Sequence, residues 1–268
     1  MKHILSIQDL SCVGRCSLTV AMPVISAMGH RCSVLPTAVL STHTAFPSPE
    51  VADLTGRLDA FARHWQENGV RFDAVTVGYL ADPKQAGIVG KILENIGAAV
   101  ILDPVMGDHG KLYRRITEDH IGALKLLAAR ADVLLPNLTE AAALTGLPYR
   151  AETDEAYLQK LVDGLLALGA KAAVITGVHL HDAAIGFYGK ARDGEAFCWQ
   201  GNHIPRQFHG TGDLFAAVLT GALANGEKLE DAARKAAEFV RCCVENTPEV
   251  TPNGVEFELQ LHRLWNTD

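Results

Sequence analysis

The sequence predicts an α/β fold with three layers, in which helices cover both faces of a central, mostly parallel sheet. Short apolar runs alternate with helix-like stretches almost from end to end, and most of these runs carry no polar alternation. Such runs are typical of parallel strands that are buried on both faces. Strands that alternate with helices indicate right-handed βαβ units, and a late hairpin signal adds antiparallel strands at one edge.

The elements before residue 177 follow this alternation in order. Strands are expected at residues 3–7, 32–39, 74–77, 99–103, 132–136 and 172–176. Helices carry apolar residues at helical spacing, and they are expected at residues 15–28, 51–68, 83–95, 118–129 and 152–168.

The pattern then changes. Two strand-like runs, 183–189 and 196–202, flank a segment that contains Asp193-Gly194. Asp-Gly between two such runs is a good hairpin signal, so the sheet is expected to end in antiparallel strands. Helices are expected after the hairpin, the last of them amphipathic, at residues 211–224, 230–244 and 255–265.

Length and composition restrict the class of protein. The 268 residues are 48% hydrophobic, which is enough for a large core, and no linker or repeat interrupts them, so residues 1–268 are expected to form one domain. The net charge of −7, with no Lys/Arg run, argues against nucleic acid or an anionic membrane as the main partner. The six cysteines show no zinc-site spacing. We therefore expect free thiols and a cytoplasmic protein without a secretory signal or membrane span.

Polar residues and glycines follow the predicted strands at their carboxyl ends, where open parallel sheets bind their ligands. One such segment alone would be ordinary for a strand end. Six of them on one edge favour a binding site, and they lie at residues 8–11, 41–44, 78–79, 103–108, 137–140 and 176–177.

The segment His209-Gly210-Thr211-Gly212-Asp213 precedes an apolar helix and is the strongest candidate for an anion site. Two glycines before a helix allow close approach of the backbone, and the helix dipole favours negative charge there. Asp213 then stands beside this hole as a candidate base. The alternative is that Thr211 or Asp213 merely caps the helix. The sequence contains neither a P-loop nor a dinucleotide-binding glycine motif.

Two further groups of oxygen ligands complement this hole. Asp103 and Asp108 flank a Pro-Val-Met-Gly turn, and Asn137 stands three residues before Glu140. Mg²⁺ prefers such ligands, and phosphoryl transfer needs it to neutralise the polyphosphate. Asn137 and Glu140 fit a helix cap with its capping-box acid equally well, and the two explanations are compatible.

Four segments, in this order, resemble the ribokinase superfamily: DPVMGD, PNLTEA, ITG and GTGDLFAA. The resemblance covers nearly the whole chain. It is strongest to the pyridoxal/pyridoxine/pyridoxamine kinase branch, because DPVMGDHGKLY together with STHT after the second strand is more specific to vitamin B6 kinases. No large β-lid of the sugar-kinase type is seen near the N-terminus, which favours the same branch.

The resemblance implies an ATP-dependent kinase with Asp213 as the base for the 5′-hydroxymethyl group of the vitamer. The anion hole would then be formed by Gly210, Thr211 and Gly212. Residues implied to organise Mg²⁺ and the phosphates of ATP are Asp103, Asn137 and Glu140, with Asp103 and Glu140 as the metal ligands and Thr176 beside the phosphate chain. The resemblance also favours a homodimer and leaves open whether a monovalent cation assists.

The pyridine ring would be framed by His43, Thr44 and Tyr79, since hydroxyls and an aromatic ring suit a flat polar heterocycle. Asp9 occupies the place of a serine in the family pattern, and the segment 45–50 also departs from it. A carboxylate at position 9 would bind a protonated pyridine nitrogen or a phenolic hydroxyl, or it would indicate a related substrate.

Three alternatives remain at this point. The first is a hydroxymethylpyrimidine kinase of the same fold, although those relatives tend to carry cysteine where this chain has Asp213. The second is a kinase for sugars or nucleosides, against which the missing lid counts. The third is a catalytically silent vitamer-binding protein, against which the intact Asp213, Glu140 and Asn137 argue.

Overall fold

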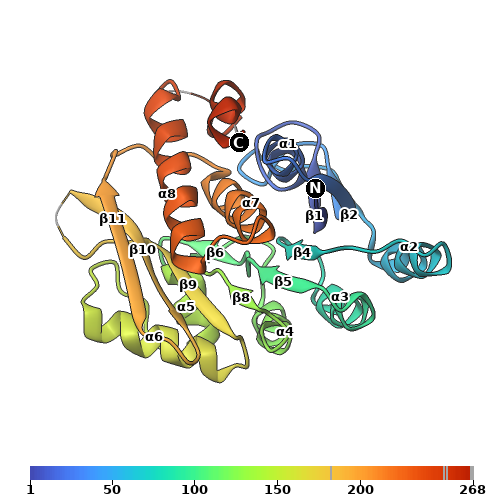
Figure 1. Ribbon diagram of the computed structural model, residues 1–268, viewed down its shortest axis with the longest axis horizontal. Coiled ribbons are helices and arrows are strands. Elements are labelled where there is room, and N and C mark those ends of the chain that lie inside the picture. The colour runs from blue at the N-terminus through green and yellow to red at the C-terminus, as the bar shows by residue number, and fades with distance from the viewer. Residues whose placement is uncertain (182, 250, 252, 266–268) are drawn as a thin grey trace.

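A nine-stranded sheet forms the centre of the protein, in the order β11-β10-β9-β8-β5-β4-β1-β2-β3 (Figure 1). The computed structural model describes residues 1–181, 183–249, 251 and 253–265. The strands that pair in parallel are β1 (His3–Ser11), β2 (Arg31–Leu40), β4 (Ala74–Val77), β5 (Ala99–Leu102), β8 (Val133–Leu134) and β9 (Ala172–Val178). Each of the six lies at a position predicted from an apolar run.

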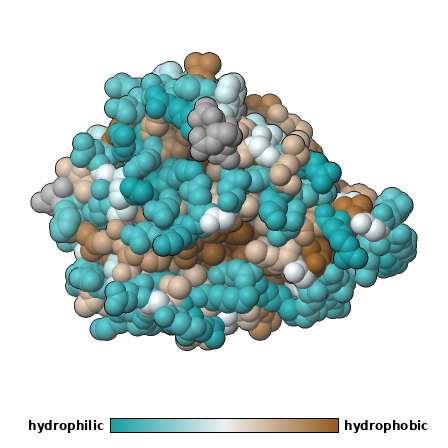
Figure 2. All heavy atoms as spheres, in the orientation of Figure 1, coloured by the Kyte–Doolittle hydropathy of each residue, from teal (hydrophilic) through white to brown (hydrophobic). Residues whose placement is uncertain are grey.

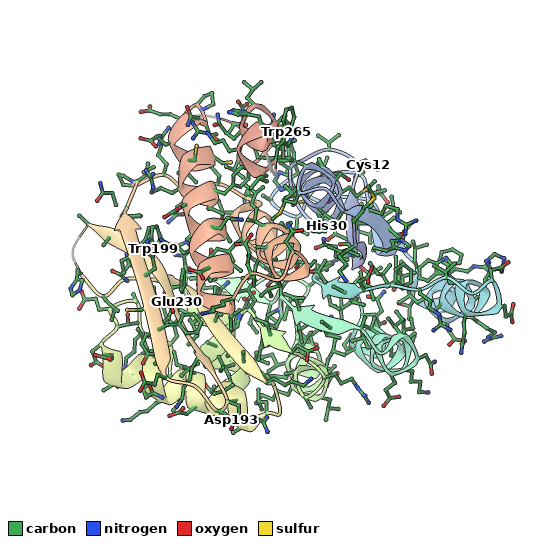
Figure 3. All side chains as sticks on the ribbon, viewed as in Figure 1. Cys12, His30, Asp193, Trp199, Glu230 and Trp265 are labelled. Atoms are coloured by element: carbon green, nitrogen blue, oxygen red, sulfur yellow. The ribbon has the colours of Figure 1, made fainter. Side chains whose placement is uncertain are left out.

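Antiparallel strands close both edges of the sheet. At one edge, β10 (Ala184–Ala191) pairs with β9 and with β11 (Ala196–Asn202), which confirms the predicted hairpin; Asp193 lies in its turn (Figure 3). At the other edge, β3 (Val51–Asp53) pairs with β2. A separate two-stranded ribbon consists of β6 (Gly107–Asp108) and β7 (Lys111–Leu112).

Helices cover both faces of the sheet, as predicted (Figure 1). One layer contains α1 (Leu18–Ala27), α7 (Thr211–Ala224) and α8 (Leu229–Asn246). The other contains α2 (Thr55–Glu67), α3 (Pro83–Ile96), α4 (Glu118–Ala128), α5 (Leu138–Thr145) and α6 (Glu155–Ala167).

The core is divided between these two layers by the alternation of side chains along each strand. In β1, Ile4 packs into the core under α1, α7 and α8, whereas Leu5 and Ile7 pack into the core under the other layer. Polar residues cover most of the face seen in Figure 2, and hydrophobic residues show as a band across its middle. Within the described residues, no helix has the length and apolar character needed to cross a membrane.

Two predicted helices are wrong in part. Residues 51–53 form the edge strand β3, because they complete a three-residue ladder with Ala38, Val39 and Leu40, and the helix begins only at Thr55. The last predicted helix, 255–265, is instead the 3₁₀-helix η1 (Glu258–Leu264). A seven-residue segment has few internal α-helical hydrogen bonds, so a short 3₁₀ turn is an ordinary outcome.

Strand β1 is longer than predicted, which matters for the site. It continues to Ser11, and its register with β2 shifts between Gln8 and Leu10. Such an irregularity re-aims the side chains beside it. Asp9, which the sequence placed just beyond the strand, therefore lies inside it, at the shifted position.

Candidate active site

Helix α7 begins at the predicted anion hole. Its N-cap residue is Gly210, which has φ 87° and provides no side-chain capping bond. The alternative that Thr211 or Asp213 caps the helix is therefore wrong; the Thr211 hydroxyl is directed to the carbonyl of Phe208, at 3.4 Å. The first N–H groups of a helix have no partner within the helix. With Gly212 exposed, this helix terminus is open to an anion.

Asp213 lies in the first turn of α7 and is partly buried. Its carboxyl accepts a hydrogen bond from the backbone N–H of Ser17. Burial raises the pKa of Asp213 to about 6, and the negative charge of Asp9 contributes to the increase. A carboxylate with a pKa closer to neutrality is a better general base than an ordinary aspartate.

Asp103 and Glu140 are both buried, with exposed fractions of 9% and 3%. Burial raises the pKa of Asp103 well above its ordinary value, and the charges of Glu140 and Asp213 raise it further. Burial also raises the pKa of Glu140, although its oxygens accept hydrogen bonds from the backbone N–H groups of Met106 and Asn137, both at 2.9 Å.

This group of carboxylates fits a divalent cation. Within the part of the chain that the structure describes, no Lys, Arg or His side chain forms an ion pair with Asp103, Glu140 or Asp213. In the same part of the chain, no group of three or more His, Cys, Asp or Glu residues is arranged so that it could hold a metal ion by itself. One or two carboxylates that share the ion with substrate phosphates are the usual arrangement for Mg²⁺. Each oxygen of Glu140 accepts one backbone hydrogen bond and retains acceptor capacity, so Glu140 can contact an ion directly or through water.

Asn137 and Glu140 form the predicted capping box at the start of α5. The Asn137 side-chain oxygen accepts from the N–H groups of Thr139 and Glu140, while its amide nitrogen donates to the carbonyl of Gly107 at 2.8 Å. Asn137 also forms a parallel bridge with Thr176. The structure thus brings Thr176, Asn137 and Glu140 to one part of the sheet edge.

The residues predicted for the acceptor ring form a second group. Asp9 is buried, and its two oxygens accept hydrogen bonds from the hydroxyls of Ser17, at 2.5 Å, and Ser11, at 3.1 Å. Burial raises the pKa of Asp9, and the nearby His43 opposes this increase. Burial also raises the pKa of Tyr79, and the charge of Asp9 adds to it.

His43 is buried between two other parts of the site. Its ring lies 5.0 Å from the ring of His209, measured between centroids, and a methyl carbon at Gly14 would stand 2.3 Å from it. Thr44 follows His43 and is exposed. The structure therefore groups Asp9, His43 and Tyr79. Thr44 is exposed beside His43.

Three residues to which the sequence gave no role also lie in this region. Ser17 bridges Asp9 and Asp213; the sequence placed it inside the helix expected at residues 15–28, which begins only at Leu18. The His209 ring lies tilted against the His43 ring, and the pKa of His209 is lowered by burial and by the charge of His43. Burial raises the pKa of Tyr113, which also lies within the fields of Glu140 and Asp108. The sequence signal for Tyr113 was its place at the end of DPVMGDHGKLY.

Comparison with known proteins finds similarity to kinases of small heterocyclic molecules. The model of the phosphomethylpyrimidine kinase family matches residues 56–256. The pyridoxine/pyridoxal/pyridoxamine kinase of Bordetella bronchiseptica is 31% identical over 92% of this chain and 89% of its own length. The hydroxymethylpyrimidine/phosphomethylpyrimidine kinase of Bacillus subtilis is 33% identical over 78% of this chain and 74% of its own.

Solved structures match the fold over nearly its full length. Pyridoxal kinase from Lactobacillus plantarum superposes with a TM-score of 0.90 at 33% identity, covering 98% of this chain and 96% of the other. A Bacteroides thetaiotaomicron protein assigned to the phosphomethylpyrimidine kinases, in a crystal form with pyridoxal, superposes with a TM-score of 0.93 at 34% identity. The superposition covers 98% of this chain and 95% of the Bacteroides thetaiotaomicron protein.

Proposed function

Because this chain belongs to the phosphomethylpyrimidine kinase family, we propose that it is an ATP-dependent kinase that phosphorylates the 5′-hydroxymethyl group of pyridoxal, pyridoxine or pyridoxamine. The relatives that support this substrate are the pyridoxal kinases of similar length at 31% and 33% identity. The structure of the 34% identical protein was determined with pyridoxal.

The observation that carries the proposal is the position of Asp213. It stands in the first turn of a helix whose N-terminus has no side-chain cap, and its charge acts on Asp103, the buried carboxylate of the cation site. A base, an anion hole and a metal site in one place are the parts that phosphoryl transfer requires.

In the proposed reaction, the Asp213 carboxylate accepts the proton of the 5′-hydroxyl group as that oxygen attacks the γ-phosphorus of ATP. The bond from the γ-phosphorus to the bridging oxygen breaks, and ADP leaves. Backbone N–H groups of Gly210, Thr211 and Gly212 hold the oxygens of the transferring group. Asp103 and, directly or through water, Glu140 would hold Mg²⁺, which supplies neutralisation of the phosphate charge. Asn137 and Thr176 would lie along the phosphate chain.

The proposed acceptor site is formed by Asp9, His43, Thr44 and Tyr79. Asp9 is a buried carboxylate whose oxygens each retain acceptor capacity beyond the serine hydroxyls. It is therefore suited to bind a protonated pyridine nitrogen or a phenolic hydroxyl. Tyr79, which is 8% exposed, presents the aromatic surface that a pyridine ring can contact.

A second candidate function is phosphorylation of hydroxymethylpyrimidine, because the Bacillus subtilis relative at 33% identity carries that name. The two acceptors share a flat nitrogen heterocycle with a hydroxymethyl group. A coupled ADP-release assay with Mg·ATP and pyridoxal, pyridoxine, pyridoxamine or hydroxymethylpyrimidine separates them. Turnover on at least one vitamer supports the proposal, and turnover on the pyrimidine alone moves the substrate to the second candidate.

We also propose that residues 1–268 act as a single kinase domain that assembles as a cytoplasmic homodimer, with Mg²⁺ as the divalent ion. The resemblance to vitamin B6 kinases supports the dimer and the ion. Light scattering on the purified protein measures the mass of the assembly. Removal of Mg²⁺ with EDTA in the ADP-release assay measures the requirement for the ion.

A further inference from the structure

Ser17 stands directly before helix α1 in a backbone conformation that is unusual for a residue with a side chain. Its φ is 49° and its ψ is −126°, and the residue is buried. Residues other than glycine are strained at such angles. Strain of this kind persists only where the surrounding structure enforces it, and it concentrates at functional sites.

The ordinary task of a serine at this position does not explain the strain. A serine at a helix N-cap normally accepts a hydrogen bond from an N–H group of the first turn. At Ser17 this side-chain bond is not formed. The hydroxyl instead donates to Oδ1 of Asp9, at 2.5 Å. The Ser17 side chain therefore serves Asp9 and not the helix.

The backbone of the same residue reaches the proposed base. The Ser17 N–H group donates to the carboxyl of Asp213, while Ser11 holds the other oxygen of Asp9 at 3.1 Å. Ser17 thus contacts one carboxylate through its side chain and the other through its main chain. It lies in the loop after β1 whose first residue, Cys12, is labelled in Figure 3.

We propose that Ser17 is a positioning residue that fixes Asp9 relative to Asp213 and so sets how the acceptor is presented to the base. The inference rests on the proposed function, in which Asp9 binds the heterocycle and Asp213 receives the hydroxyl proton. Transfer needs the reacting atoms within about 3–3.5 Å and aligned. A single residue that directs its hydroxyl to one carboxylate and its N–H to the other supplies that alignment, and the strained conformation allows both bonds.

Two variants separate the hydroxyl from the backbone strain. Ser17→Ala removes the hydroxyl and keeps the strain, whereas Ser17→Gly removes the hydroxyl and relieves the strain. Both lose one hydrogen bond to a carboxylate, so we expect KM for the vitamer to rise about 10- to 100-fold in each, with KM for ATP unchanged. The melting temperature of Ser17→Gly should exceed that of Ser17→Ala.

A matched control tests strain relief alone. Ala183 has φ 60° and lies next to β10, which four strands of the sheet separate from β1. Ala183→Gly should leave both KM values unchanged. A double-mutant cycle tests whether Ser17 acts through Asp9. Once Asp9→Ala has removed the carboxylate that accepts the Ser17 hydrogen bond, Ser17→Ala should raise KM for the vitamer no further.

Three results would overturn the inference: a wild-type KM for the vitamer in Ser17→Ala, equal losses for vitamer and ATP, or additive losses in the cycle. A wild-type protein that turns over no vitamer would overturn the proposed function instead. In that case the interaction between Ser17 and Asp9 is judged from the melting temperatures of Asp9→Ala, Ser17→Ala and the double variant. If the two residues interact, the decreases in melting temperature of the single variants do not add up in the double variant. Additive decreases in that measurement would reject the link.

Discussion

The backbone of Gly210 lies directly against the carbonyl oxygen of Arg15: a methyl carbon added to Gly210 would stand 2.0 Å from that oxygen. Arg15 is itself held by the C-terminal part of the chain, since its guanidinium pairs with Glu258 at 2.7 Å and with Glu256 at 3.6 Å. The entrance to helix α7 is therefore fixed by contact with the loop that carries Ser17.

Gly210→Ala is expected to lower the free energy of unfolding by about 2–4 kcal/mol, because it adds a collision to the cost of φ 87°. Turnover should fall with it, since relief of the collision moves the anion hole. Gly226→Ala is the matched control, because Gly226 has φ 88° and open space around its added carbon. It should cost only about 1 kcal/mol and leave turnover intact. Chemical denaturation measures both values, and equal losses in the two variants would refute the packing argument.

The pH dependence of kcat/KM should show an acid limb near pH 6. Asp213 must be ionised to accept a proton, and burial raises its pKa to about 6 from 3.8, so activity should fall about tenfold per pH unit below that value. The charges that face Asp213 include Asp9 and Asp103. Since the charge of Asp9 contributes to the increase, Asp9→Asn should move the limb to lower pH. The pKa values of the free vitamer, which are measured separately by titration, identify any limb that comes from the vitamer and not from Asp213. A limb that stays in place in Asp9→Asn would contradict the assignment.

Asp103→Asn should stabilise the metal-free protein at pH 8 while it abolishes most turnover. A carboxyl whose pKa is raised on folding binds its proton more tightly in the folded state, so its ionisation lowers stability as the pH rises above 3.8. Removing that charge should raise the free energy of unfolding at pH 8 and change it little at pH 4. The exposed Asp108, whose side chain is 52% accessible, provides the control Asp108→Asn, which should leave stability nearly unchanged. Thermal unfolding of the metal-free proteins at the two pH values measures this difference in stability. An Asp103→Asn protein that is less stable than the wild type at pH 8 would contradict the prediction.

The sheet could be predicted because its strands follow a simple physical rule. Runs such as residues 74–77 and 172–176 are apolar throughout, since both faces of a parallel strand are buried. The strand β3 and the ribbon of β6 and β7 escaped prediction because two or three residues carry no periodicity. The formation of β3 depends on pairing with residues 38–40 of β2, and the formation of the ribbon depends on a tight turn.

The site was predictable where the motif itself carries the geometry. The glycines at 210 and 212 and the Asn137–Glu140 pair predicted an open helix terminus and a capping box, and both are present. Ser17 escaped because it fell inside the helix expected at residues 15–28, whereas the helix begins only at Leu18. Only the fold shows that its hydroxyl turns to Asp9. The resemblance of the sequence to the vitamin B6 kinases, and with it the ribokinase-like fold, is confirmed by relatives that cover nearly the whole chain.

A comparison of Asp213→Asn with the wild type tests whether Asp213 is the base of a vitamin B6 kinase. Turnover of pyridoxal is followed by ADP release at saturating Mg·ATP, and nucleotide binding is followed by the shift in melting temperature with Mg·ATP. We expect a loss of turnover of about 10²- to 10⁴-fold, with the nucleotide-induced shift in melting temperature retained. Near-native turnover in Asp213→Asn would contradict this role for Asp213.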